Sequence, residues 1–285
     1  MLGIEASEGA LSNLYYEISD LIRRGEMPPV PQVASVGETI EKLLHSDLSI
    51  ARFGDGEFKF MFLKGSIGFQ QQDERLAARL REVFVTRDEN PMIAVQDFFG
   101  FLGGGKSWFR PLVCQIRPHI NPLFDFQRLY YNTGVTRNIT SAEHFTKLKR
   151  LWHEKDVVLV EGSMCRMGIG NDLFDNVRSL RRILAPAENA FRVYEEILEK
   201  TSSLDKGVLF LIALGPTATV LAYDLARRGF RALDVGHLDI CYELFLRGAT
   251  EMQPIEGKYV NEVSYRSPTD CRDEKYLSSI LCHIK

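Results

Sequence analysis

Short apolar runs that alternate with amphipathic helical segments constrain the fold of this chain more than any other feature. Two of them, Val208–Leu214 (VLFLIAL) and Asp156–Glu161 (DVVLVE), have no polar residue between their ends. A strand with one solvated face alternates in polarity, whereas a strand of a parallel sheet is covered on both faces and stays apolar. The pattern therefore predicts an α/β fold, with a mostly parallel sheet and helices on both of its faces.

The expected strands and helices follow one another along most of the chain. Asp73 can cap the helix that follows it, and Thr140 has capping-box spacing with Glu143. Gly229 lies in the usual position beyond a helix end. The predicted strands are 48–53, 92–95, 128–131, 156–161, 208–214 and 231–235, and the predicted helices are 35–46, 73–84, 140–152, 188–200, 217–228 and 238–246.

Composition narrows the range of partners and cellular locations. The 285 residues carry a formal net charge of −3 and no long basic tract, which argues against nucleic acid as the main partner. The five cysteines are widely spaced and odd in number, which predicts reduced thiols in a cytoplasmic protein. The N-terminus lacks a signal-peptide pattern, and the longest apolar run is too short to cross a bilayer. We expect no transmembrane segment, and peripheral contact with the inner face of the membrane is left open.

The chain divides into three expected parts. Residues 1–34 combine apolar positions at helical spacing with Pro28-Pro29-Val30-Pro31, which predicts a short helical leader and a stiff proline-rich link. Residues 35–250 contain the alternating strands and helices and form the expected main domain. Residues 251–285 are expected to be an extension packed on the same domain.

Unusual residues collect just after the predicted strands. In open α/β sheets, ligands bind at the carboxyl ends of the strands. If the strands are parallel, these residues all lie along one edge of the sheet, and their convergence predicts a single ligand site. The clusters are Asp55-Gly56-Glu57, Asp97, 162–166, Gly215-Pro216-Thr217 and 234–239.

Asp55 and Glu57 are candidate metal ligands. Gly56 between them tolerates positive φ, so the backbone can turn and bring both carboxylates to one cation. Mg²⁺ and Mn²⁺ prefer oxygen ligands and share their remaining positions with water and substrate phosphates. The alternative is that Asp55 caps a helix that starts near Glu57, and the tripeptide alone leaves both interpretations open.

Gly215-Pro216-Thr217 joins an apolar strand to a helix. A helix N-terminus presents unpaired N–H groups and partial positive charge, which suits a phosphate. The run lacks the six-position glycine fingerprint of dinucleotide-binding folds and the Lys-Ser/Thr of a P-loop. An ordinary tight turn between strand and helix explains it equally well.

The loop after residue 162 offers further polar candidates. Arg166 could pair bidentately with a phosphate, and Asn171 and Asp172 could hold sugar hydroxyls or cap the next helix. The pair Arg181-Arg182 is more typical of a solvated face, although it could also neutralise a diphosphate.

His237 and Asp239 follow the last predicted strand. Histidine as a residue class suits general base catalysis near neutral pH, but a lone histidine is more often structural. No zinc-ligand spacing, G-x-S-x-G turn or cysteine-based catalytic pattern is present.

Several of these runs, taken in order, resemble the GT-D glycosyltransferase family, formerly called domain of unknown function 1792. The resemblance extends from about residue 36 to Gly248 and on through 257–263 (GKYVNEV), and it does not cover the leader. The runs that carry it are SIARFGDGEF (49–58), Gly68-Phe69-Gln70 with Asp73, VEGSMCRMGIGNDLF (160–174), AENAF (187–191), ALGPTA (213–218) and LDVGHLD (233–239).

The resemblance implies a Rossmann-like sheet and transfer of a sugar from a nucleotide-sugar donor. It also implies a D-x-E metal motif, which falls on Asp55 and Glu57. We expect a UDP-hexose donor, a glycan or glycoconjugate acceptor, and Mn²⁺ or Mg²⁺ as cofactor. Met164-Cys165 departs from the family, in which smaller polar residues are expected before the arginine. The expected donor-binding residues are Arg52, Gly54, Asp97, Arg166, Asn171, Gly215, Pro216 and Thr217, and the expected bases, in order, are His237, Asp239 and Asp172.

Two other functions remain alternatives at this point. A metal-dependent nucleotide-sugar hydrolase or phosphodiesterase would use the same residues with water as the acceptor. A nucleotide-binding module without catalytic activity would use the same pocket without turnover.

Overall fold

A computed structural model describes residues 20, 24, 31–62, 68–96, 121–137, 139, 141–260, 263 and 271–285. The predicted helical leader and the four residues Pro28-Pro29-Val30-Pro31 lie outside these residues, apart from residues 20, 24 and Pro31. Asp97 lies outside them as well.

The described residues form one nine-stranded sheet in which every pair of neighbouring strands is parallel. The six predicted strands are present, so the mostly parallel α/β fold is confirmed. The order across the sheet is β1 (Gln32–Val33), β4 (Leu129–Asn132), β3 (Met92–Val95), β2 (Ile50–Phe53), β8 (Arg231–Asp234), β7 (Leu209–Ala213), β5 (Asp156–Gly162), β6 (Ser179–Ala185) and β9 (Ile280–His283).

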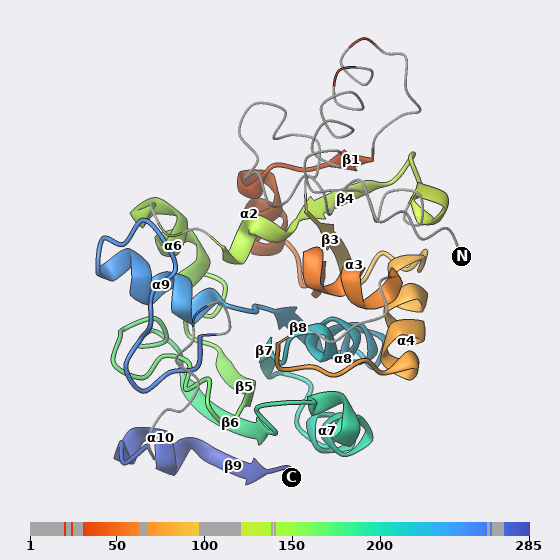
Figure 1. Ribbon diagram of the computed structural model, residues 1–285. Coiled ribbons are helices and arrows are strands. Elements are labelled where there is room, and N and C mark those ends of the chain that lie inside the picture. The colour runs from red at the N-terminus through yellow and green to blue at the C-terminus, as the bar shows by residue number, and fades with distance from the viewer. Residues whose placement is uncertain are drawn as a thin grey trace.

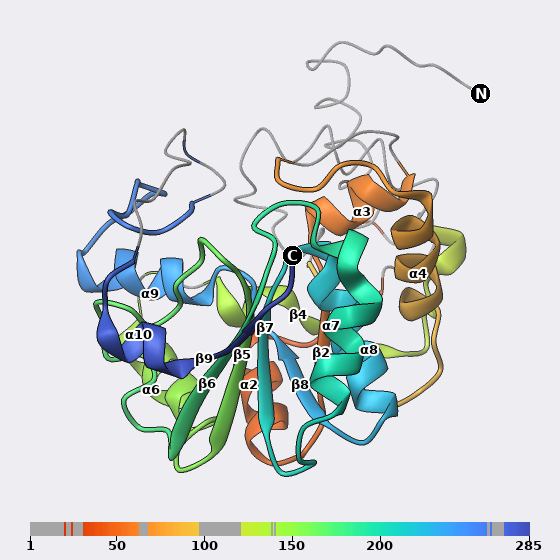
Figure 2. The same ribbon diagram turned by 90° about the horizontal axis from the view of Figure 1, so that it is seen from below.

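Helices cover both faces of the sheet, as predicted. Figure 2 shows α4, α7 and α8 together on one side of the strands and α6 and α9 on the other. The first face carries α3 (Asp55–Phe62), α4 (Glu74–Phe84), α7 (Tyr194–Ser202) and α8 (Pro216–Arg227), and the second carries α2 (Val36–Leu44), α6 (Ala142–Lys149) and α9 (Leu238–Leu246). Three short 3₁₀ helices, η1 (Asn121–Leu123), η2 (Thr133–Thr136) and η3 (Ala190–Val193), and the helix α10 (Glu274–Ser279) complete the described elements.

The apolar strands divide their side chains between the two core layers. In β5, Val158 and Val160 pack on the first face, whereas Val157 and Leu159 pack on the second. All four side chains are fully buried. Because a strand points successive side chains to opposite faces, this arrangement requires the unbroken apolar run seen in the sequence.

Three strands were not predicted. The two-residue strand β1 lies in the segment that was expected to be a leader and proline-rich link. Strand β6 contains Arg181 and Arg182, and its first three residues are only partly buried, so it lacks an apolar run. Arg182 is nevertheless buried and forms an ion pair with Glu161 of β5, so neither the solvated face nor a diphosphate contact applies to it. Strand β9 belongs to the C-terminal extension and lies at the edge of the sheet beside β6 (Figure 1).

Helix caps agree with the sequence except at one position. Asp73 caps α4 as predicted, accepting hydrogen bonds from the backbone N–H groups of Arg75 and Leu76. Helix α6 is capped by Ser141, whose Oγ accepts from the backbone N–H of His144. The predicted capping box between Thr140 and Glu143 is therefore wrong by one residue, because the serine oxygen is the acceptor at the helix start.

The chain leaves β2 and β8 toward opposite faces of the sheet. Strand β2 continues into α3, whose Phe58 packs in the first core layer, and β8 continues into α9, whose Leu238 packs in the second. Neighbouring parallel strands whose connections diverge in this way leave a crevice at their carboxyl ends. That end of the sheet, where β2, β5, β7 and β8 terminate, is called the rim below. No helix among the described residues is both long enough and apolar enough to cross a membrane.

Candidate active site

A buried ion pair between Arg52 and Asp234 closes the floor of the crevice. The Nη2 atom of Arg52, on β2, lies 3.2 Å from Oδ1 of Asp234, at the end of β8. The Nη1 atom donates to Oγ1 of Thr136 at 2.5 Å. Thr219 of α8 donates to the Arg52 carbonyl at 2.9 Å and lies 3.3 Å from Asp234 Oδ2. The end of β8 and the 3₁₀ helix η2 thus hold the guanidinium in place, and α8 holds the Arg52 backbone, next to the predicted metal motif.

Gly236 allows the chain to pass close to this guanidinium. Its φ is +49°, and a Cβ atom at this position would lie 2.0 Å from Arg52 Nη2. Only glycine adopts this backbone conformation readily and leaves room for the arginine.

Asp55 and Glu57 occupy the first turn of α3. The helix therefore starts at Asp55, two residues earlier than the capping alternative assumed. Asp55 Oδ2 accepts a hydrogen bond from Lys59 Nζ at 2.9 Å, one helical turn on. Glu57 Oε2 accepts from the backbone N–H of Gly54 at 2.8 Å. Residues two apart on a helix do not share a face, so the carboxylates have different partners here.

Negative charge accumulates around Glu57. Burial, followed by the neighbouring charge of Asp234, raises the pKa of Glu57 to about 7, although the Gly54 N–H and Arg52 oppose the shift. Burial likewise raises the pKa of Asp234, although Arg52 opposes the shift. Two carboxylates therefore share one guanidinium in a desolvated crevice, and an added cation would relieve the imbalance.

The two carboxylates are oxygen donors of the type that hard divalent cations prefer. Within the described residues, no three His, Cys, Asp or Glu side chains are grouped closely enough to hold a metal by themselves. Mg²⁺-type ions are commonly bound through one or two carboxylates plus phosphate oxygens and water. Asp55 and Glu57 supply carboxylates of this kind, but both would have to turn toward one ion, since here Asp55 pairs with Lys59 and Glu57 with the Gly54 N–H.

The start of α8 borders the same crevice. Gly215 has φ of +55°, and a Cβ there would lie 2.3 Å from the ring of Phe69. Pro216 opens the helix, and the Oγ1 of the fully buried Thr217 has no hydrogen-bond partner among the described residues. The tight turn is thus present, and it points a helix N-terminus toward the rim, as an anion site requires.

Asp239 lies in a saturated network rather than in the open crevice. Its Oδ1 accepts from the Gly168 N–H at 2.8 Å and from Asn171 Nδ2 at 2.9 Å, and its Oδ2 lies 2.7 Å from Lys258 Nζ. Asn171 Nδ2 also donates to Glu243 at 2.7 Å. Both oxygens of the buried Asp239 are engaged, so the geometry favours a positioning role over that of a base.

Asp172 is held by two neighbouring polar groups. Its carboxylate accepts from Lys149 Nζ at 2.7 Å and from the Tyr242 hydroxyl at 2.6 Å. The Lys149 hydrogen bond, followed by that of Tyr242, lowers the pKa of Asp172 below its usual range. The pairing and the lowered pKa both disfavour Asp172 as a base.

Arg166 faces the C-terminal part of the chain. It has φ of +53°, is 8% exposed, and donates from Nη1 to the Gly257 carbonyl at 2.8 Å. In this arrangement the guanidinium stabilises the loop after β5, so the geometry does not favour the predicted phosphate contact. His237, by contrast, is half-buried and lies three residues after β8, as the N-cap residue of α9.

The family model described as "Glycosyltransferase GT-D fold" matches residues 50–263. The chain belongs to the GT-D glycosyltransferase family. The predicted family and enzyme class are therefore confirmed. The matched range includes the D-x-E motif, the crevice residues and the network around Asp239.

Curated relatives of this GT-D chain carry matching names. It is 35% identical over 267 residues to "Probable glycosyl transferase Gly" of Streptococcus gordonii, an alignment that covers 88% of this chain and 39% of that protein. It is 33% identical over 268 residues to "Glycosyltransferase GlyD" of Streptococcus pneumoniae serotype 4, covering 89% and 32%. The chain thus spans less than half the length of these relatives.

Solved structures share the whole fold of this GT-D chain. A structure described as "A New Glycosyltransferase (DUF1792) from Streptococcus sanguinis" has a TM-score of 0.82 and 34% identity, covering 90% of this chain and all of that one. A second, described as a domain of unknown function 1792 with "a distinct glycosyltransferase fold", has a TM-score of 0.84 and 30% identity, covering 98% and 100%.

Three residues of the GT-D site had no predicted role. Asp234 and Thr219 complete the Arg52 cluster, and Lys258 is the cation of the Asp239 network. Asp234 lies at a strand end, within the predicted cluster 234–239, but no role was assigned to it there. Lys258 is nineteen residues from Asp239, in a loop without periodicity, and no local pattern indicates its partner.

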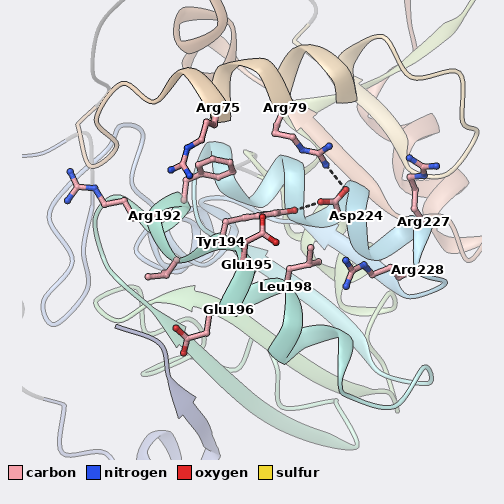
Figure 3. Close-up of a pocket in the computed structure, with 12 residues that line it drawn as sticks. Arg75, Arg79, Arg192, Tyr194, Glu195, Glu196, Leu198, Asp224, Arg227 and Arg228 are labelled. Carbon is pink, nitrogen blue, oxygen red and sulfur yellow. Dashed lines mark hydrogen bonds and ion pairs between the residues drawn. The ribbon is translucent and has the colours of Figure 1, made fainter.

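A groove of about 890 Å³ lies on the helical flank, between α4 and α7 and beside α8 (Figure 3). Asp224 forms hydrogen bonds there with Arg79 at 2.6 Å and with the Tyr194 hydroxyl at 2.5 Å. None of the predicted site residues lines this groove.

Proposed function

We propose that this chain transfers a hexose from a nucleotide-sugar, specifically a UDP-sugar, to a glycan or glycoconjugate acceptor, with Mn²⁺ or Mg²⁺ as cofactor. The proposal places the protein in the cytoplasm. Family membership supports glycosyl transfer, and the donor, the ion, the acceptor and the location are our inference.

One observation carries the proposal. The D-x-E motif, the Arg52–Asp234 pair and the start of α8 meet at the point where the connections of β2 and β8 diverge. That position is where α/β sheets bind nucleotides. A helix N-terminus and a fixed guanidinium suit phosphate oxygens, and the two carboxylates suit a cation bound to them.

Asp55 and Glu57 would hold the ion at the mouth of the crevice. When bound, a divalent ion neutralises the charge that develops on a departing diphosphate, which is worth several kcal/mol at the transition state. Lys59 pairs with Asp55 at 2.9 Å in this structure and would release it when the ion binds.

The remaining chemistry falls to the chain's own side chains and amides. The guanidinium of Arg52 would present its positive charge at a fixed position on the crevice floor, because Asp234 and Thr136 hold it on two sides. The amides at Gly215–Thr217 would orient phosphate oxygens, and water is replaced there by fixed dipoles. His237, at the start of α9, would take the proton from the acceptor hydroxyl.

The decisive experiment is a screen of nucleotide-sugars that reads nucleotide release, with Mn²⁺ and with EDTA in its place. We expect release from a UDP-sugar with Mn²⁺, and loss of release with EDTA or in Glu57→Gln. Nucleotide release that is unaffected by EDTA would contradict the proposed metal dependence, and no release from any donor would contradict the proposed activity.

Product analysis separates the alternatives. A hydrolase would produce free sugar at the same rate with and without a glycan acceptor. A binding module would show no turnover at all, and Asp55→Ala would leave its affinity for the nucleotide unchanged in the presence of Mn²⁺.

A further inference from the structure

The segment Ile255–Val260, called the strap below, comes from the C-terminal part of the chain and lies against the loop that follows β5. The Tyr259 N–H donates to the Met164 carbonyl at 3.0 Å. The Gly257 carbonyl accepts from Arg166 Nη1 at 2.8 Å. Two contacts thus join the strap to a loop at the rim, although the strap forms no part of the sheet.

Lys258 anchors the strap to α9. Its Nζ lies 2.7 Å from Asp239 Oδ2 and 3.0 Å from Glu243 Oε1, both on α9, and the residue is 4% exposed. A lysine is buried at this depth only when its charge is paired. The strap therefore has one defined position relative to the start of α9.

Tyr259 is the residue that the anchored strap presents at the rim. It is half-buried, and its ring meets that of Phe69 edge to face, with the centroids 6.4 Å apart and the planes at 88°. Phe69 in turn covers the backbone of Gly215 at the start of α8. A pair of partly exposed aromatic rings thus stands beside the helix N-terminus at which the proposed function places the diphosphate.

We propose that Phe69 and Tyr259 form the wall on which the nucleoside of the donor packs, and that Lys258 is the positioning residue that holds this wall. The inference rests on the proposed function. Planar bases stack on aromatic rings, and a base attached to a diphosphate at the α8 N-terminus would lie within reach of the pair. The strap would then select a nucleotide over a bare diphosphate.

The test compares two probes, UDP and inorganic pyrophosphate, each titrated with Mn²⁺ into the purified chain by calorimetry. We expect Tyr259→Ala to weaken UDP binding about tenfold and to leave pyrophosphate binding unchanged, because only UDP carries a base. Tyr259→Phe keeps the ring and should retain wild-type affinity for both probes. Phe126→Ala removes a half-buried aromatic ring near the start of β4 and is the matched control.

Lys258→Met should weaken UDP binding as Tyr259→Ala does. If that variant does not fold, Phe69→Ala and Tyr259→Ala carry the test. If Tyr259→Ala weakens the binding of UDP and pyrophosphate equally, or binds UDP as tightly as the wild type does, the proposal that Phe69 and Tyr259 form the nucleoside wall is wrong. Either result would leave the proposed function intact. Absence of UDP binding to the wild-type chain would overturn the proposed function and this inference together.

Discussion

Replacing Lys258 with methionine tests the buried network most severely. The change removes the cation that lies 2.7 Å from Asp239 and 3.0 Å from Glu243 and keeps a side chain of similar length. Both acids are almost fully buried, at 2% and 6% exposure, so water cannot replace the ammonium. Burial alone would raise the pKa of Glu243, but the Asn171 amide and Lys258 together hold it below the ordinary value.

The expected cost follows from the unpaired charge. Removing one partner of a buried ion pair typically destabilises a protein by about 3–5 kcal/mol. We therefore expect the free energy of unfolding to fall by about 3 kcal/mol or more in urea titrations at pH 7, and the melting temperature to fall by roughly 10 °C. Addition of Asp239→Asn and Glu243→Gln should restore part of the loss, because the neutral side chains no longer need a cation.

An exposed ion pair provides the control. Arg178 lies 3.1 Å from Asp156, with 63% and 37% of the two side chains exposed. Arg178→Met should leave the unfolding midpoint unchanged, since water solvates the remaining acid. A loss below about 1 kcal/mol in Lys258→Met would refute the reasoning that the network depends on this charge.

Three further outcomes follow from the geometry. Gly236→Ala should lower the free energy of unfolding by about 2 kcal/mol and reduce nucleotide release, because the new Cβ would lie 2.0 Å from Arg52 Nη2. Urea titration measures the first effect and the release assay the second. Arg182→Met should cost about 3–5 kcal/mol by isolating the fully buried Glu161, and a wild-type unfolding curve would contradict it. The pKa of Glu57 is raised to about 7, so the free energy of unfolding of the metal-free protein should fall as the pH rises from about 4.5 to 7. Glu57→Gln should remove this pH dependence, and an unaltered pH profile in that variant would contradict the expectation.

The strands and the position of the site could be predicted because their signals are local. An apolar run between two helices is sufficient to identify β5 or β7, and the parallel arrangement then places every strand end on one rim. Strand β6 could not be identified in this way. Its Arg182 is buried only because Glu161, twenty-one residues earlier, lies beside it in the folded chain.

The roles of single residues were harder to predict for the same reason. Arg166 and Asp239 stand at strand ends, where ligand contacts are expected, yet their hydrogen bonds go to Gly257 and to Lys258. Those partners lie in a loop far along the chain. Sequence spacing identifies a residue at the rim, but it does not show whether the side chain meets a ligand or another segment.

The central claim is that Asp55 and Glu57 hold a divalent ion on the diphosphate of the donor. Electron paramagnetic resonance of Mn²⁺ tests it directly, because free aqueous Mn²⁺ gives a sharp signal that is lost on binding. We predict that one equivalent of the ion binds to the wild-type chain when UDP is present, and that Asp55→Asn and Glu57→Gln each leave the ion free. Mn²⁺ binding that persists in both variants, or that is absent from the wild-type chain with UDP, would contradict it.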